Sequence, residues 1–110
     1  MKDDLSHRLV ALTRDLVLIP TISTRPDNIE RSIEFIKNHL EETEGITIQT
    51  HSSHGIPCIT ALPKNQPKPD VLFCAHVDVV TLSEDALYRS RIENGRIYGP
   101  GAADMKGALA

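Results

Sequence analysis

The chain has 110 residues, of which 40% are hydrophobic and 25% are charged, and its formal net charge is −3. This length suits one small soluble domain, and the scattered basic residues argue against a surface that binds nucleic acid. No apolar run approaches the roughly 20 residues of a membrane span, and the acidic N-terminus is unlike a secretory signal. We therefore expect a cytoplasmic protein that has neither a nucleic acid nor a membrane as its partner.

Two amphipathic helices are predicted in the first half of the chain. Apolar residues recur at steps of three and four over residues 4–18, and Pro20 ends this pattern because proline disfavours helical angles in the residue before it. A second helix is predicted from Asp27, which begins a capping box, to about residue 43. Both helices are expected to cover a sheet.

Strands are predicted from alternating or continuous apolar runs in the rest of the chain. Residues 46–50 and 56–62 read as half-buried strands, and residues 71–77 read as a strand buried on both faces. Asn94 and Gly95 interrupt residues 92–98 with the pair that favours a two-residue hairpin turn. The predicted class is α/β, with a mixed sheet flanked by helices.

Polar groups occur at the end of the predicted buried strand. His76 and Asp78 are two residues apart, so in a strand both would project from the same face. Burying an imidazole and a carboxylate is costly unless a metal, a proton or a hydrogen-bond partner uses them. A glycine-rich stretch over residues 99–107 then delivers another carboxylate, Asp104. We expect His76 and Asp104 to converge near one cation.

These residues carry a resemblance to a known family. His76-Val77-Asp78, followed by Gly-Ala-Ala-Asp-Met-Lys-Gly at residues 101–107, resembles the co-catalytic metallohydrolase family of acetylornithine deacetylase, succinyl-diaminopimelate desuccinylase, aminoacylase and carboxypeptidase G. The likeness begins at Leu-Ile-Pro-Thr-Ile-Ser, residues 18–23, and continues in order to the second motif. It implies that residues 1–110 are the N-terminal portion of a zinc-exopeptidase-like catalytic domain, without a second domain.

The resemblance also implies a role for each site residue. His76 and Asp104 become metal ligands, with Asp104 bridging two metals, and Asp78 acts in catalysis by orienting His76. The implied cofactor is Zn²⁺, two ions per complete site, with Co²⁺ or Mn²⁺ as substitutes. The family further leads us to expect a strained peptide just after Asp104.

The implied activity is metal-dependent hydrolysis of an amide bond in an N-acyl amino acid or small peptide. Pro100 occupies a position where the desuccinylase branch usually has arginine and glutamate-carboxypeptidase-like members often have proline, which argues against a strict desuccinylase. The family's general base and remaining ligands are expected beyond the equivalent of Ala110, so the chain alone is expected to be an inactive fragment. The resemblance leaves a homodimer open for the full-length enzyme.

Three other interpretations compete with the metal centre. His76 and Asp78 can be a core histidine and its hydrogen-bonded carboxylate, without a function. Cys74, His76 and Asp78 can form a cysteine-hydrolase triad, although residues two apart in a strand are separated by roughly 6.6 Å. We expect Cys58 and Cys74 instead to be buried, reduced thiols. Finally, the chain can be a non-catalytic α/β domain that folds with or binds a partner.

Overall fold

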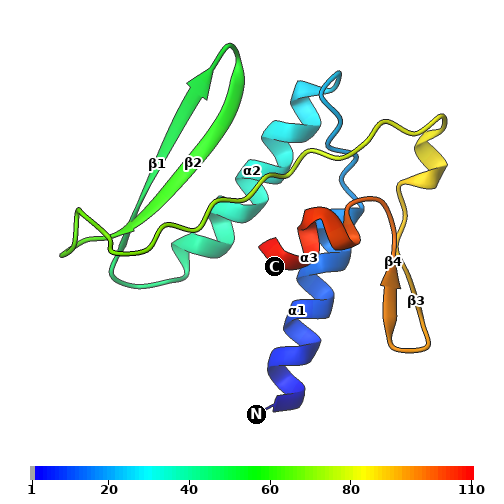
Figure 1. Cartoon of the computed structure of the whole chain (residues 1–110), viewed down its shortest axis with the longest axis horizontal. Coiled ribbons are helices and arrows are strands. Elements are labelled where there is room, and N and C mark those ends of the chain that lie inside the picture. The colour runs from blue at the N-terminus through cyan, green and yellow to red at the C-terminus, as the bar shows by residue number, and fades with distance from the viewer. Residues whose placement is uncertain (1) are drawn as a thin grey trace.

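The computed structural model describes residues 2–110, and its first two elements are the two predicted helices, α1 (Lys2–Val17) and α2 (Pro26–Glu41) (Figure 1). The predicted start of α2 at Asp27 is wrong by one residue. Pro26 occupies the first turn, where its fixed φ suits the helix and its missing N–H is not needed. Asp27 therefore lies inside the first turn, where a carboxylate favours the helix dipole, and no side chain caps the helix.

Two antiparallel hairpins supply the strands. β1 (Ile46–Ser53) pairs with β2 (Ile56–Pro63), with Ser53 opposite Ile56 next to the turn. His54 and Gly55 form this turn with φ values of 51° and 78°. Positive φ at both central residues gives the turn the twist that suits a two-residue hairpin.

The second hairpin confirms the turn predicted at Asn94 and Gly95. β3 (Arg91–Glu93) pairs with β4 (Arg96–Tyr98), and the two turn residues have φ values of 51° and 72°. After β4 the chain forms a wide, irregular turn, η2 (Ala102–Lys106), and then the single helical turn α3 (Gly107–Leu109). The motif that contains Asp104 is therefore a turn and not a regular helix.

The α/β class is confirmed, but the predicted mixed sheet is not formed by residues 2–110. Both sheets have two antiparallel strands, and residues 71–82 run extended without strand pairing. Val71, Leu72 and Phe73 are 67%, 72% and 93% exposed, so the segment is not a buried strand. A continuous apolar run predicts burial only where neighbouring strands and a covering layer are present. The exposure of Cys58 and Cys74, both free thiols, contradicts the predicted burial in the same way.

The core lies where the C-terminal half of α1, the loop that follows it and α2 meet. α2 contacts the β1–β2 hairpin, and α1 contacts η2 and α3, as Figure 1 shows. The buried apolar side chains are Leu16, Val17, Ile19, Ile22, Ile29 and Tyr88. The loop at residues 18–22 is therefore one of the best-anchored parts of the fold. No helix within residues 2–110 has the length and hydrophobicity of a membrane span.

Candidate metal centre

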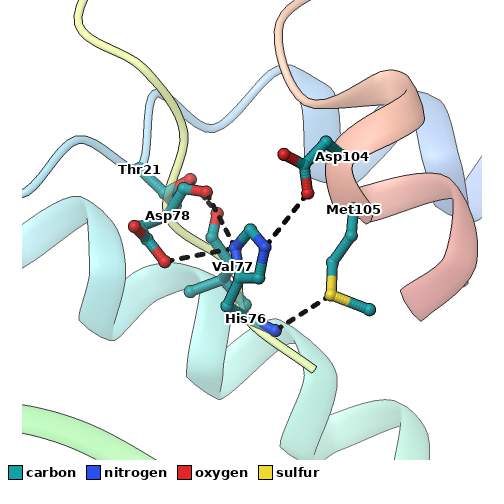
Figure 2. Close-up of polar contacts among 6 residues, drawn as sticks. All are labelled: Thr21, His76, Val77, Asp78, Asp104 and Met105. Atoms are coloured by element: carbon teal, nitrogen blue, oxygen red, sulfur yellow. Dashed lines mark hydrogen bonds and ion pairs between the residues drawn. The ribbon is translucent and has the colours of Figure 1, made fainter. Parts of the chain in front are cut away.

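Two segments that are far apart in the sequence meet at His76. His76 and Asp78 lie near the end of the extended segment 71–82, and Asp104 lies in η2. His76 Nε2 is 3.1 Å from Asp104 Oδ1, and Figure 2 shows the imidazole ring between the carboxylates of Asp78 and Asp104. The predicted convergence of His76 and Asp104 is therefore observed, although the expected sheet is not.

The two nitrogens of His76 have different surroundings. Nδ1 is 3.2 Å from the Asp78 carbonyl oxygen and 3.2 Å from Asp78 Oδ1, while Nε2 faces only Asp104 among the described residues. If Nδ1–H donates to Asp78, a neutral ring directs its Nε2 lone pair at a carboxylate oxygen. Two acceptors at 3.1 Å repel each other unless a proton or a cation lies between them. The donor set therefore fits a bound metal, and without one it favours a protonated ring.

Electrostatics at this ring agree with that geometry. Desolvation lowers the pKa of His76, but hydrogen bonds and charge attraction from Asp78 and Asp104 outweigh it and raise the pKa above the ordinary value of 6.5. The site is open, because the side chains of Asp104 and Asp78 are 87% and 63% exposed. A cation and further ligands can therefore approach Asp104 from solvent.

Three residues that the sequence did not single out hold the site together. The sulfur of Met105 accepts a hydrogen bond from the His76 main-chain N–H at 3.3 Å. The Thr21 hydroxyl donates a hydrogen bond to the Val77 carbonyl. Lys106 is fully buried, and its ammonium group donates a hydrogen bond to the Ile19 carbonyl. Thr21 lies in the quoted stretch at residues 18–23, and Met105 and Lys106 lie in the motif at residues 101–107. Position in these stretches was the only available signal. The peptide bond between Asp104 and Met105 is cis.

Gly101 brings η2 close to the extended segment. Its φ is +78°, and an added Cβ would lie 2.5 Å from Val79 Cγ1. We expect Gly101→Ala to lower the free energy of unfolding by about 2 kcal/mol. The cost of a left-handed backbone conformation for alanine adds to the cost of crowding its Cβ against Val79. Gly55→Ala is the matched control, since Gly55 also has a φ of +78° but open space around it. Urea unfolding of both variants would separate the two costs, and equal losses would contradict the close approach at Gly101.

The competing residue clusters do not form sites within residues 2–110. No hydrogen bond links Cys74 to His76, so the cysteine triad is not assembled. Two other histidines that are close in the sequence, His51 and His54, bond to the hydroxyl groups of Thr60 and Ser53, and all four residues are exposed on the first hairpin. No group of three His, Cys, Asp or Glu side chains among the described residues is arranged so that it could hold a metal ion. His76 and Asp104 are therefore a pair of candidate ligands and not a closed metal site.

Comparison with known proteins relates this sequence to one family. The sequence model of peptidase family M20/M25/M40 matches residues 72–110, which contain the candidate ligands. Succinyl-diaminopimelate desuccinylase of Rickettsia akari (strain Hartford) is 31% identical over 104 residues, covering 88% of this chain and 27% of the relative. The desuccinylase of Xanthobacter autotrophicus (strain ATCC BAA-1158 / Py2) is 30% identical over 111 residues, covering 92% of this chain and 28% of the relative. The chain thus spans about a quarter of the length of these relatives, and the resemblance of its sequence to peptidase family M20/M25/M40 is confirmed.

Proposed function

We propose that the chain supplies His76 and Asp104 as ligands, and Asp78 as the group that orients His76, to a metal centre that hydrolyses amide bonds. The observation that carries this proposal is the 3.1 Å approach of His76 Nε2 to Asp104 Oδ1, with Asp78 on the opposite nitrogen. A carboxylate on the second nitrogen of a ligating histidine fixes its tautomer and raises its basicity. The match to the family model supports the same assignment, because both segments lie within the matched residues.

Zinc is the metal that this donor set suits best, with cobalt or manganese as substitutes. When bound, a pair of zinc ions activates water and polarises the scissile carbonyl group. Asp104 is the candidate bridging residue, because its carboxylate has two oxygens and its side chain is largely exposed. Asp78 would keep the proton of His76 on Nδ1, which would leave the Nε2 lone pair, on the side of Asp104, free for a cation.

The chain alone is expected to bind zinc weakly and to lack turnover. Structural and catalytic zinc sites have three or four protein ligands, whereas His76 and Asp104 are two, and no larger cluster exists within the described part of the chain. No residue of this chain is assigned as the general base that hydrolysis requires. We therefore propose that the remaining ligands and the base come from outside the residues described.

We propose an N-acyl amino acid or a small peptide as the substrate class. The relatives are named for the removal of a succinyl group from diaminopimelate, which makes N-succinyl amino acids the first candidates. Pro100 argues against a strict desuccinylase, and glutamate-carboxypeptidase-like members of the family often have proline at this position, so N-acyl glutamates are the second candidates. A cytoplasmic location and a homodimeric complete enzyme stay predictions.

The test combines metal binding with hydrolysis. Zinc binding to the 110-residue chain is measured by calorimetry. Hydrolysis of N-succinyl, N-acetyl and glutamyl substrates is assayed with this chain and with the longest polypeptide that its gene encodes. We expect weak zinc binding without turnover for the chain, and turnover in the longer product that His76→Ala abolishes. Zinc-independent hydrolysis, or a chain whose zinc binding is unchanged by His76→Ala, would overturn the proposal. Tight stoichiometric binding with turnover by the chain itself would overturn only its assignment as an incomplete enzyme.

A second candidate is a non-catalytic α/β domain that folds with a partner. The exposed apolar run Val71-Leu72-Phe73 favours it, because an extended segment with unpaired backbone groups is a template for strand addition. Zinc binding at His76 discriminates between the two candidates. Loss of zinc binding in His76→Ala would support the metal centre. A chain that does not bind zinc at all would favour the non-catalytic domain that folds with a partner.

A further inference from the structure

The loop that follows α1 is bonded to the segment that carries His76 and Asp78. Thr21 is fully buried, and its hydroxyl donates to the Val77 carbonyl while its own carbonyl accepts from the Val79 N–H at 3.0 Å. These two bonds lie on either side of Asp78 in the sequence, as the position of Thr21 beside Val77 and Asp78 in Figure 2 illustrates. The extended segment has no strand partner within residues 2–110, so Thr21 holds it where a sheet does not.

The same loop is bonded to the segment that carries Asp104. The Lys106 ammonium donates to the Ile19 carbonyl at 2.7 Å, and this fully buried side chain forms no ion pair with any described residue. Burying a charged group with one neutral partner is costly, so this contact is not an incidental surface bond. Lys106 is two residues from Asp104, as Thr21 is two residues from Ile19. One short loop thus contacts both ligand-bearing segments.

Direct contacts join the two segments beyond the loop. Gly101 lies against Val79, and the Lys106 side chain lies beside Gly101. Met105 accepts the hydrogen bond from the His76 main-chain N–H. The loop, the extended segment and η2 therefore form a closed set of contacts, and shifting one segment changes the distance between His76 and Asp104.

We propose that Thr21 and Lys106 are positioning residues of the metal centre, which set the separation of His76 and Asp104 through the loop at residues 19–21. Neither residue touches the candidate cation. Each holds one ligand-bearing segment against the same buried loop, so the ligands are placed before a metal binds. The metal role of this arrangement rests on the proposed function.

Thr21→Val is the first test, because it removes the hydroxyl donor with little change of shape. Thr21→Ser restores the donor, and Lys106→Leu breaks the contact on the other side of the loop. Ser32→Ala is the matched control: Ser32 is also fully buried, and its hydroxyl also donates to a backbone carbonyl, that of Ile29, but within α2. A purely structural role would make Thr21→Val behave like Ser32→Ala at the site.

Zinc affinity is the first measurement, followed through the His76 ring signals in NMR spectra of the 110-residue chain. We expect Thr21→Val and Lys106→Leu each to weaken zinc binding about 10-fold, at the low end of the range for groups that position ligands. Thr21→Ser and Ser32→Ala should bind zinc as the parent chain does. Equal zinc affinity in Thr21→Val, Lys106→Leu and Ser32→Ala would overturn the proposal.

A second measurement needs no metal. Met1 and Met105 are the only methionines in the sequence, so a methyl-labelled methionine sample contains one reporter in η2. We expect a nuclear Overhauser effect between the Met105 methyl group and the His76 amide proton, lost in Thr21→Val and Lys106→Leu but kept in Ser32→Ala. Its survival in both site variants would overturn the positioning role. If the parent chain shows this contact but does not bind zinc, the proposed function is overturned. The conclusion that the loop sets the distance between His76 and Asp104 would still be supported.

Discussion

His76→Ala should abolish zinc binding by the chain, whereas Asp78→Ala should weaken it by about 10–100-fold, as is typical when the hydrogen-bond partner of a ligating histidine is removed. The difference follows from the two nitrogens of His76. Nε2 faces Asp104, where the cation would lie, and Nδ1 faces the carbonyl and carboxylate of Asp78. Losing Asp78 frees the ring to rotate or change tautomer but leaves the ligating nitrogen present.

Calorimetry and NMR titration of the three chains would measure this difference. His51→Ala is the matched control, because His51 is an exposed histidine held by one hydrogen bond, on β1. We expect zinc binding in His51→Ala to equal that of the parent chain. If Asp78→Ala lost zinc binding as completely as His76→Ala, Asp78 would be a direct ligand and the assigned roles would be wrong. If His51→Ala lost the metal instead, the site would lie on the first hairpin.

Raising the pH from about 8 to about 10 should stabilise the fold, because Lys106 is buried. Burial lowers the pKa of Lys106 from its ordinary 10.5 to about 8. Below pH 8 both the folded and the unfolded chain carry the proton, and the folded chain bears the full cost of a buried charge. Between the two pKa values the folded chain has released the proton while the unfolded chain retains it, so the free energy of unfolding rises with pH. The gain from pH 8 to pH 10 is about 2 kcal/mol at roughly 1.4 kcal/mol per pKa unit, and the full gain of about 3 kcal/mol is reached only above the unfolded pKa.

Urea unfolding at a series of pH values would measure this gain. Lys106→Leu should remove the rise, whereas Lys64→Gln should keep it, because Lys64 is an exposed lysine in the turn after β2. A parent chain whose stability stays level or falls over this range would show that Lys106 stays charged in the folded state. Such a result would also mean that the ammonium has more partners than the Ile19 carbonyl.

Local chemistry explains why the two helices and the hairpin at residues 92–98 could be predicted. Asn94 and Gly95 adopt positive φ at little cost, so two residues suffice to reverse the chain wherever the hairpin lies in the fold. Pro26 shows the limit of such rules, because a capping box at Asp27 and a proline at the first helical position compete for the same turn. The proline decided the boundary.

Burial could not be predicted from the sequence with the same success. Residues 71–77 have the composition of a central strand, yet Phe73 is 93% exposed, because a strand is buried by neighbours that lie elsewhere in a fold. Lys106 shows the reverse, since a lysine is rarely fully buried and nothing in its local sequence suggests a contact with Ile19. Burial depends on contacts between segments that are distant in the chain.

The same distinction between local properties and long-range contacts applies to the candidate site. The amino-acid sequence by itself determined the identity of His76, Asp78 and Asp104, the two helices, the hairpin at residues 92–98, and the resemblance that led to the family. Side-chain chemistry, turn preferences and motif order are local properties. Only the tertiary structure decided that His76 lies between two carboxylates and that Thr21 and Lys106 connect both segments to one loop. Those distances depend on how α1, the extended segment and η2 pack together, and packing is a property of the whole fold.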